Sequence, residues 1–334
     1  MRVLVTGGAG YVGSVSVDAL LDAGHDVVVL DDLSTGHRGA VAERANLVAG
    51  TYADGEAVAG LLEGERIEAI LHCGARSLVG ESMEDPARYY RDNVAGGVAL
   101  LEAARHVGVQ RLVFSSSAAV YGVPEETPIE ESAALRPINT YGETKRAFEA
   151  ALAAYGVAYG LRSVTLRYFN VAGATELRGE DHDPETHLIP NVLRAAEDGP
   201  GAGDPVKVFG DDYPTPDGTC IRDYIHVVDL AAAHVLALEA TAPADPRTDA
   251  PLVCNLGSGG GYSVGEVLLA AERVVGRPIP QRVVGRRPGD PPVLVAAIGR
   301  AADVLGWRPV RSSLEAMIAS AWDSRLRNQG GYRS

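Results

Sequence analysis

The sequence is poor in cysteine, and its three cysteines, Cys73, Cys220 and Cys254, are widely spaced. An odd number at such spacing excludes a dense disulfide framework and a standard zinc motif, and it is typical of buried reduced thiols. Long apolar runs are also absent, because each run has only the length of a strand, so no membrane-spanning helix is expected. No signal-peptide pattern precedes the first expected strand at residue 2, and we therefore expect a cytoplasmic protein.

Positive charge is scarce as well. Lysine and arginine together number 30 against 44 aspartates and glutamates, which gives a formal net charge of −14. This balance argues against nucleic acid or an anionic membrane surface as a partner, and an anionic small substrate would need local arginines. The length of 334 residues is sufficient for two intimately packed domains.

The N-terminal segment predicts a dinucleotide site. Residues 2–6 read as a strand, a glycine-rich turn follows at 7–13, and an apolar helical pattern then ends at Gly24. A second strand at 26–30 leads into Asp31. In such a βαβ unit the glycines let the backbone approach a pyrophosphate, while the acid accepts hydrogen bonds from a ribose diol. Asp31 would repel a 2′-phosphate, so we expect NAD rather than NADP.

Strands continue to alternate with helices along the first half of the chain. Further strands are expected at 69–72, 111–114 and 163–167, and helical patterns occupy 94–106 and 141–154. This alternation predicts an α/β fold with a doubly wound, Rossmann-type parallel sheet.

The sequence changes in character after Asn170, where polar loop segments become frequent. We therefore expect residues 1–170 to form the NAD-binding domain and residues 171–334 to form mainly a smaller C-terminal α/β domain for the substrate. The strand expected at 252–256 would return to the first sheet, so segments near 222–262 are expected to belong partly to the first domain.

The chain contains only two lysines, and one of them, Lys145, follows Tyr141 by four residues. Thr140 and Glu143 match a capping box, so a helix is expected to start here and to carry Tyr141 and Lys145 on one face. A free tyrosine has a pKa of about 10, too high for proton abstraction at neutral pH, and a nearby ammonium favours the phenolate. The pair therefore predicts an acid/base tyrosine.

The segment 180–187 places His182 and His187 among four acidic residues. Its spacing matches no standard zinc pattern. We expect a solvated loop here, and no metal ion.

Several further motifs carry a resemblance to a known family. They are Ser115 to Ser117 before Val120-Tyr121-Gly122, Arg167 to Asn170, Asp212 to His226, Asn255 to Gly259 and Arg286 to Asp290, together with the glycine-rich turn and the Tyr141/Lys145 pair. The chain resembles the UDP-glucose 4-epimerase family of the extended short-chain dehydrogenases/reductases over residues 1 to about 325. The resemblance implies an NAD-dependent isomerase that interconverts UDP-glucose and UDP-galactose through a 4-keto intermediate. It also implies a homodimer paired through the helices near 94–106 and 141–154.

The same resemblance implies roles for individual residues. Ser117, Tyr141 and Lys145 would be catalytic. The implied NAD contacts are Gly7, Gly10, Tyr11, Val12, Gly13, Asp31, Asp32, Leu33, Ser34, Thr35, Gly36, Thr51, Tyr52, Cys73, Gly74, Ala75, Arg76, Ser77, Asp92, Asn93, Ser115, Tyr141, Lys145, Tyr168 and Phe169. The implied UDP-sugar contacts are Ser117, Tyr141, Asn170, His187, Leu188, Lys207, Val208, Phe209, Arg222, Arg287, Asp290 and Leu294. Arg222 and Arg287 would clamp the diphosphate, because a guanidinium fork matches phosphate oxygens.

Three positions depart from the family pattern. Thr51 replaces a strand-end acid that would meet the adenine amine, and Ser77, with Arg76 beside it, stands where many epimerases have a lysine. Asp92 replaces the first asparagine of an Asn-Asn-Val motif. These changes concern cofactor affinity more than chemistry.

Other functions share this fold. A nucleotide-sugar 4,6-dehydratase needs an acid pair after the catalytic serine, where this chain has Ala118 and Ala119. A 4-epimerase of a UDP-pentose or UDP-N-acetylhexosamine differs only in the size of the sugar pocket. A binding protein for NAD or a nucleotide sugar that has lost catalysis is the alternative from another class, and the intact Ser117, Tyr141 and Lys145 argue against it.

Overall fold

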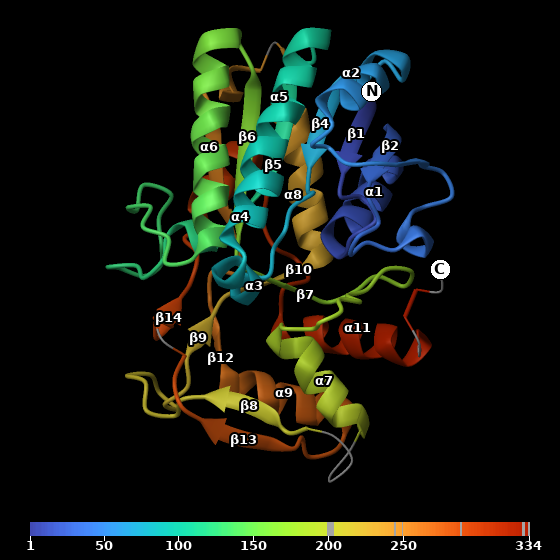
Figure 1. Cartoon of the computed structure of the whole chain (residues 1–334). Coiled ribbons are helices and arrows are strands. Elements are labelled where there is room, and N and C mark those ends of the chain that lie inside the picture. Colours follow the sequence, from blue (N-terminus) through green and yellow to red (C-terminus); the bar gives the residue numbers. More distant parts are fainter. Residues whose placement is uncertain (199–203, 244, 249, 288, 329–330, 333–334) are drawn as a thin grey trace.

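The computed structural model describes residues 1–334 except 199–203, 244, 249, 288, 329–330 and 333–334. A large sheet with helices on both of its faces forms the upper part of the molecule in Figure 1. A smaller layer of helices and short strands lies below it. The α/β class with a doubly wound parallel sheet, which the sequence predicts, is confirmed.

Seven parallel strands form the main sheet in the order β11-β6-β5-β4-β1-β2-β3. They are β1 (Arg2–Thr6), β2 (Asp26–Asp31), β3 (Asn46–Ala49), β4 (Ala69–His72), β5 (Arg111–Ser117), β6 (Arg162–Tyr168) and β11 (Leu252–Leu256). The winding direction reverses between β1 and β4, which pair with each other. Open α/β sheets bind their ligands beyond the carboxyl ends of the strands at such a reversal. The topology therefore places a ligand site beyond Thr6 and His72.

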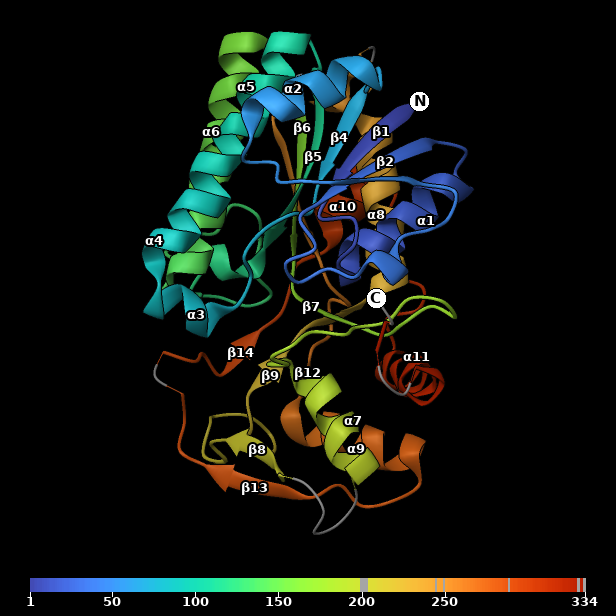
Figure 2. The same cartoon turned by 45° about the vertical axis from the view of Figure 1, so that its right-hand side comes forward.

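Helices cover both faces of the sheet, as Figure 2 shows. The helices on one face are α2 (Gly55–Gly64), α5 (Gly96–Val107) and α6 (Thr140–Tyr159), and those on the other are α1 (Tyr11–Asp22), α8 (Val227–Ala240) and α10 (Gly299–Leu305). Successive residues of β1 serve different cores, because Val3 and Val5 pack on the α1/α8 side and Leu4 packs on the α2/α5 side. This explains why the strands read as continuous apolar runs rather than alternating patterns.

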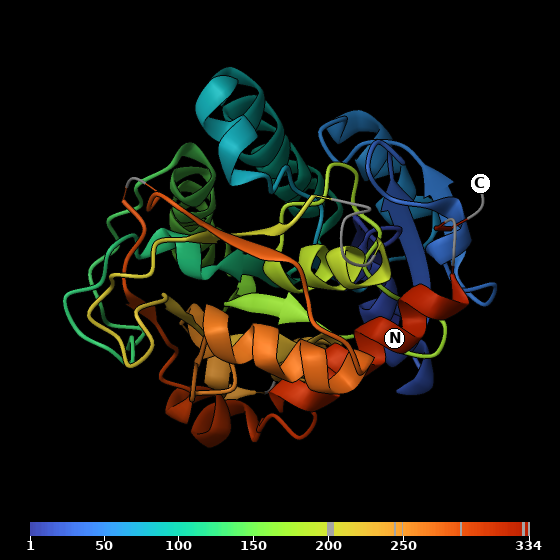
Figure 3. The ribbon, with the colours of Figure 1, turned by 90° about the horizontal axis from the view of Figure 1, so that it is seen from below.

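The lower layer is built on α7 (Leu188–Asp198), α9 (Val264–Val275) and α11 (Leu314–Arg327), which Figure 3 shows from below. Helix α9 packs against both α7 and α11. Three small sheets complete the layer: β7 (Asn170–Ala172) with β10 (Tyr224–His226), β8 (Val206–Phe209) with β13 (Gln281–Val284), and β9 (Ile221–Arg222) between β12 (Tyr262–Ser263) and β14 (Val293–Leu294).

Helix α6 forms as predicted, but its cap differs. Asn139 is the capping residue, since its Oδ1 accepts a hydrogen bond from the backbone N–H of Gly142 at 2.8 Å. The hydroxyl of Thr140 instead contacts the sulfur of Met83 at 3.9 Å. The predicted capping box of Thr140 and Glu143 is therefore wrong.

The helix predicted at 94–106 also begins differently. It is preceded by α3 (Val79–Glu84), by α4 (Pro86–Tyr89) and by a π-helical turn (Tyr90–Ala95) that leads directly into α5. The side chain of Asp85 caps α4 by accepting a hydrogen bond from the backbone N–H of Arg88. The helical path therefore starts earlier than the apolar pattern alone indicates.

Residues near the C-terminus contact the first layer. The ring of Tyr332 stacks on His37 with 5.5 Å between centroids, and its hydroxyl accepts a hydrogen bond from the backbone N–H of Gly179 at 2.7 Å. His37 Nε2 in turn bonds to the carbonyl of Asp181 at 2.9 Å. Three distant segments of the chain thus meet beside the glycine-rich turn.

The three cysteines are free, as expected, with Cys220 and Cys254 buried and Cys73 partly exposed. Among the described residues, no helix is both long and apolar enough to cross a membrane.

Candidate active site

A cleft of about 1960 Å³ is lined by residues of both layers. From above, its walls are the segments that follow β1, β2, β4 and β5, and from below they are α7, β8, β9 and β14. The cleft thus lies at the carboxyl ends of the parallel strands, where the reversal of strand order predicts a ligand site.

Two glycines of the turn at the cleft, Gly7 and Gly13, have no space for a Cβ atom. Gly7 has a φ of +70°, and a Cβ there would lie 2.6 Å from the Cα of Gly74. A Cβ on Gly13 would lie 2.1 Å from the carbonyl oxygen of Gly7. Gly10 caps α1 without any side-chain hydrogen bond, so the N–H groups of the first turn have no side-chain acceptor. These features fit the pyrophosphate of a dinucleotide.

Asp31 ends β2 with a buried carboxylate that lines the cleft. Its oxygens accept hydrogen bonds from the backbone N–H groups of Ala9 and Leu33, each at 2.9 Å. Burial raises the pKa of Asp31, and these two hydrogen bonds act in the opposite direction. A carboxylate has further lone pairs, so Asp31 can hold the turn in place and still accept hydrogen bonds from ribose hydroxyls.

Tyr141 and Ser117 meet in the cleft. Ser117 is the last residue of β5, and Tyr141 lies in the first turn of α6. Both side chains line the cleft, and the hydroxyl oxygen of Ser117 accepts a hydrogen bond from the backbone N–H of Ala119 at 3.2 Å. Burial raises the pKa of Tyr141, and the side chain of Ser117 counteracts this increase.

Lys145 lies one helical turn beyond Tyr141 and is only 3% exposed. Its Nζ donates a hydrogen bond to the carbonyl of Ser115 at 2.8 Å and lies 4.7 Å from the centroid of the Phe114 ring. The distance from Nζ to the Tyr141 ring centroid is 5.8 Å. Burial lowers the pKa of Lys145 from 10.5 to about 8. In the protein without NAD, the pKa of Tyr141 is thus not lowered as expected, because burial is the largest influence on the pKa values of both Tyr141 and Lys145.

A buried hydrogen-bonded chain supports the position of Lys145. The hydroxyl of Ser115 lies 2.9 Å from His234 Nε2 and 3.3 Å from the sulfur of Cys73, and His234 Nδ1 lies 3.2 Å from the hydroxyl of Ser16. Burial lowers the pKa of His234 to about 3, so the ring is neutral at neutral pH. Sequence reasoning missed His234 because no local motif links it to Ser115, 119 residues away.

Arg76, which adjoins the departure at Ser77, and the departure Asp92 are neighbours in space. The Arg76 Nε donates to the Asp92 carboxylate at 3.2 Å. Asn93 fixes the backbone of Arg76, because its Oδ1 accepts from the Arg76 N–H at 2.8 Å and its Nδ2 donates to the Arg76 carbonyl at 3.0 Å. The arginine beside Ser77 is therefore paired with the acid that stands where the resemblance implies an asparagine.

Arg222 and Arg287 line the lower wall of the cleft. The guanidinium of Arg222 forms an ion pair with Asp290 and donates to the carbonyl of Ile221. The guanidinium of Arg287 lies over the ring of Phe209, 3.8 Å from its centroid. Both planar groups are held in place while part of their N–H donors can bind an anion, which suits a diphosphate.

Other predicted substrate residues lie on the same wall. Asn170 begins β7 and donates from its side chain to the carbonyl of Asp223 at 3.0 Å. Leu294 on β14 is the register partner of Arg222 on β9. Lys207 and Phe209 line the cleft, whereas Val208 between them packs into the lower core, because side chains alternate along a strand.

The cleft brings most of the predicted site residues together. From the upper layer these are Gly7, Gly10, Tyr11, Val12, Gly13, Asp31, Asp32, Ser34, Thr35, Gly36, Thr51, Tyr52, Cys73, Gly74, Ala75, Arg76, Ser77, Asp92, Ser117, Tyr141, Lys145, Tyr168 and Phe169. From the lower layer they are Asn170, His187, Leu188, Lys207, Phe209, Arg222, Arg287, Asp290 and Leu294. The cleft is not lined by Leu33, Asn93, Ser115 or Val208.

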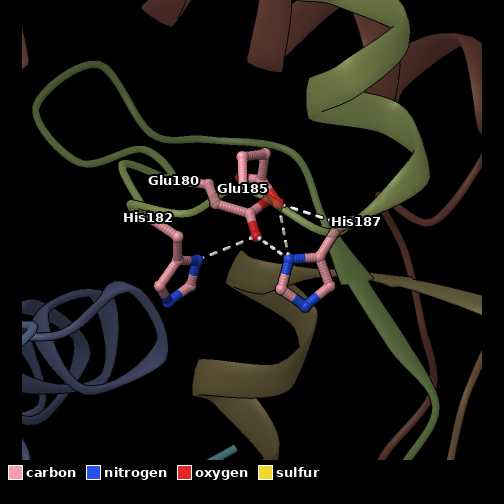
Figure 4. Close-up of side chains that lie close together, drawn as sticks. All are labelled: Glu180, His182, Glu185 and His187. Carbon is pink, nitrogen blue, oxygen red and sulfur yellow. Dashed lines mark hydrogen bonds and ion pairs between the residues drawn. The ribbon is translucent and has the colours of Figure 1, made fainter. Parts of the chain in front are cut away.

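Segment 180–187 is only partly the solvated loop that the sequence predicts. Asp183, Thr186 and His187 are exposed, whereas the side chains of Glu180 and Glu185 are only 8% and 9% exposed. His187 Nδ1 lies 2.8 Å from a carboxylate oxygen of each, and His182 Nδ1 lies 3.1 Å from that of Glu180 (Figure 4). Burial opposes a charge on His187, but its hydrogen bonds and attraction to Glu180 and Glu185 prevail and raise its pKa to about 10.

Helix α7 adds two polar cleft residues that the sequence analysis did not single out, Asn191 and Arg194. They are three residues apart and share one helix face, and their side chains are hydrogen-bonded. The available signal was this spacing of polar residues, because no motif marks either of them.

Known proteins resemble this chain over nearly its whole length. Residues 3–257 match the sequence pattern of the NAD dependent epimerase/dehydratase family. A protein of Corynebacterium glutamicum named UDP-glucose 4-epimerase is 48% identical over 322 residues, which cover 96% of this chain and 95% of the relative.

Solved structures agree with this match. The UDP-glucose 4-epimerase of Brucella ovis in complex with NAD is 49% identical, with a TM-score of 0.91 and coverage of 96% of this chain and 97% of that one. The UDP-glucose 4-epimerase of Bifidobacterium longum in complex with NAD+ and UDP is 36% identical, with a TM-score of 0.92 and coverage of 99% and 100%. The family resemblance read from the sequence motifs is thereby confirmed, and the chain belongs to the NAD dependent epimerase/dehydratase family.

Proposed function

We propose that this protein is an NAD-dependent 4-epimerase that interconverts UDP-glucose and UDP-galactose. The observation that carries the proposal is that Tyr141 and Ser117 line one cleft together with the glycine-rich turn and two arginines. An acid/base group between a dinucleotide cradle and a diphosphate clamp is what oxidation and re-reduction of one sugar carbon require. The names of the relatives support the same activity.

In the proposed mechanism, Tyr141 as phenolate accepts the proton of the sugar 4-hydroxyl while C4 is oxidised to a ketone. Ser117, which lines the cleft with Tyr141, would share the proton path. NAD, when bound, supplies a positively charged hydride acceptor that later returns the same hydride, so the cofactor is not consumed. Lys145 is held by the Ser115 carbonyl and would bind the cofactor ribose. Tyr141 finally returns its proton to the 4-oxygen, so that no net proton is gained or lost in the reaction.

Inversion at C4 requires that the 4-keto sugar present its other face to the hydride. The binding energy must therefore reside in UDP rather than in the hexose. We assign the diphosphate to Arg222 and Arg287, and the nucleotide to the wall of His187, Leu188 and Lys207. We assign the sugar to the end of the cleft near Leu294, which packs against the same apolar cluster as Ala118, the residue after Ser117.

The cofactor and substrate contacts predicted for the individual residues remain part of this proposal. We propose that residues 1–170 bind NAD and that residues 171–334 mainly bind the UDP-sugar. The edge strand β11 belongs to the cofactor-binding sheet although it lies far along the chain.

The rival functions differ in what the cleft must contain. Elimination of water by a 4,6-dehydratase needs an acid after the serine, and Ala118 and Ala119, which line the cleft there, offer none. A UDP-pentose or UDP-N-acetylhexosamine would use the same chemistry with a different fit at the sugar end. A non-catalytic binding protein would have no need for the buried Tyr141, Ser117 and Lys145.

Incubating the purified protein with UDP-galactose and then stopping the reaction tests the proposal. Appearance of UDP-glucose, measured afterwards with UDP-glucose dehydrogenase and added NAD, is the expected result. A folded protein that binds NAD and UDP but releases no UDP-glucose would instead support the binding-protein alternative. UDP-N-acetylgalactosamine and UDP-arabinose, assayed in parallel by chromatography, separate the remaining sugar specificities.

We further propose a homodimer that pairs through the helices near 94–106 and 141–154. Exposed apolar side chains adjoin these helices, with Met83 of α3 59% and Tyr90 of the π-helical turn 44% exposed. Light scattering of the purified protein measures the state directly. The three free cysteines suit a reducing compartment, so we keep the cytoplasm as the proposed location.

A further inference from the structure

Four side chains of one short segment converge on a single point beside the cleft. The ligand-type atoms of Glu180, His182, Glu185 and His187 all lie within 4.8 Å of one another (Figure 4). Each histidine directs Nδ1 at the carboxylate of Glu180, at 3.1 Å from His182 and 2.8 Å from His187. His187 Nδ1 also lies 2.8 Å from Glu185. The cluster therefore has two imidazole nitrogens and two carboxylates around one centre.

The charges of this cluster suit a divalent cation. Glu180 and Glu185 are each more than nine-tenths buried, and two ionised carboxylates removed from water beside one another repel. The ring of His187, when protonated, brings one positive charge against these two negative ones. One divalent ion would replace that proton, neutralise both carboxylates and accept the lone pairs of both histidines.

The distances suit a small tetrahedral ion. With metal–ligand bonds of about 2.0–2.2 Å, the ligand atoms of a tetrahedral zinc site lie roughly 3.3–3.6 Å apart. The present separations, from 2.8 Å to at most 4.8 Å, bracket that range. The four ligand atoms are thus already close to the spacing that one zinc ion requires.

We propose that Glu180, His182, Glu185 and His187 bind one divalent metal ion, with Zn²⁺ the best match to two imidazoles and two carboxylates. Four protein ligands leave no open position, so the ion would be structural rather than catalytic. Its place in the fold indicates what it would stabilise. The segment joins β7 to the first turn of α7, and the His182 ring meets the ring of Tyr11, in the glycine-rich turn, at 6.5 Å.

The metal would thus fix the wall that carries Leu188 against the turn that cradles the dinucleotide. Figure 4 shows the second ring nitrogen of His187 on the side of the ring away from the two carboxylates. Coordination through Nδ1 would make this Nε2 a hydrogen-bond donor at the cleft. The inference does not depend on the proposed epimerase activity, because metal binding can be measured without substrate.

The test begins with protein whose affinity tag has been cleaved off and whose metal has been removed with a chelator. Elemental analysis after exposure to Zn²⁺ and gel filtration should find one zinc per chain, and calorimetry should give one saturable site. Millimolar Mg²⁺ should not compete, since imidazole ligands favour Zn²⁺ over Mg²⁺. Competition by Mg²⁺, or the absence of stoichiometric zinc, would overturn the proposal.

The variant His182→Gln should weaken zinc binding by more than about 100-fold, beyond the roughly 10–100-fold that loss of a hydrogen-bond partner of a ligand costs. His106→Gln is the matched control, because His106 is exposed at the end of α5, far from the cluster in sequence, and zinc binding should not change. Should His182→Gln fail to fold, Glu185→Gln serves as the second test. Unchanged zinc affinity in the folded variant would show that the four side chains form only an internal ion-pair cluster.

Discussion

Replacement of Tyr141 by phenylalanine tests the acid/base assignment most directly. The change removes one oxygen from a ring that is 8% exposed, so the packing of α6 is retained. Loss of this single hydroxyl should lower the free energy of unfolding by at most the contribution of one hydrogen bond, about 0.5–1.5 kcal/mol. Turnover should fall much further, by roughly 10²–10⁴-fold, because the proton acceptor is gone. That range corresponds to about 2.7–5.4 kcal/mol in activation free energy.

Tyr155→Phe is a matched control on the same helix. The Tyr155 hydroxyl donates to Glu102 at 2.5 Å and does not line the cleft. Its removal therefore deletes one tyrosine oxygen and one hydrogen bond without touching the proposed proton path. Its activity should stay close to that of the wild type.

The assay measures kcat with UDP-galactose, the NAD content of the purified protein and the midpoint of urea unfolding for wild type and both variants. We expect Tyr141→Phe to fold and to hold NAD while its kcat collapses. Turnover within about tenfold of wild type would refute the assignment of Tyr141 as the base. An equal loss in Tyr155→Phe would show that the effect comes from the helix rather than from the proton.

Three further predictions follow from the described contacts. Arg222→Ala and Arg287→Ala should each weaken UDP binding by roughly 2–4 kcal/mol in calorimetry. The effect should be larger for Arg222, because its removal leaves the Asp290 carboxylate without its ion-pair partner. Arg286→Ala is the control, since Arg286 does not line the cleft and UDP binding should not change. Leu294→Ala should raise kcat/KM for UDP-N-acetylgalactosamine and leave kcat/KM for UDP-galactose unchanged, since we expect the leucine to impose about a 10–200-fold preference for UDP-galactose. An unchanged ratio of the two kcat/KM values would show that Leu294 does not face the hexose. The pKa of Lys145 is about 8 in the folded protein without NAD, against 10.5 in an unfolded chain. Below pH 8 the buried ammonium is charged in both the folded and the unfolded state and lowers the free energy of unfolding. This destabilisation should shrink as the pH rises toward 10, because the folded state then loses the proton first. Urea titrations should show the free energy of unfolding of the wild type rising relative to that of Lys145→Met between pH 7 and pH 10. A difference that stays constant with pH would contradict burial as the cause of the lowered pKa.

Local patterns in the sequence predicted the sheet well. The strand expected at 69–72 is β4, and the strands at 111–114 and 163–167 lie inside β5 and β6. These are short apolar runs buried on both faces, where composition and burial agree. The capping residue of α6 could not be predicted in the same way, since Asn139 and Thr140 are adjacent and both residue types can cap a helix. Asn139 caps the helix in the structure while Thr140 contacts Met83, a tertiary contact that no local pattern contains.

The electrostatics of the site could not be read from spacing alone. Tyr141 and Lys145 do lie one turn apart, but burial raises the pKa of the first and lowers that of the second. The Arg76–Asp92 pair and the Glu180–His187 cluster depend likewise on which side chains the fold turns inward. A solvated and a buried loop with the same acids look identical as sequences.

The edge strand β11 has a consequence for protein engineering. It completes the main sheet beside β6, yet the chain reaches it only after passing through β7, α7 and β9 of the lower layer. A chimera that joins the first half of this protein to the second half of a relative would therefore exchange a sheet strand along with the sugar wall. Transplanting substrate preference between relatives would require two separate exchanges, one on each side of Leu252–Leu256, with this strand kept native.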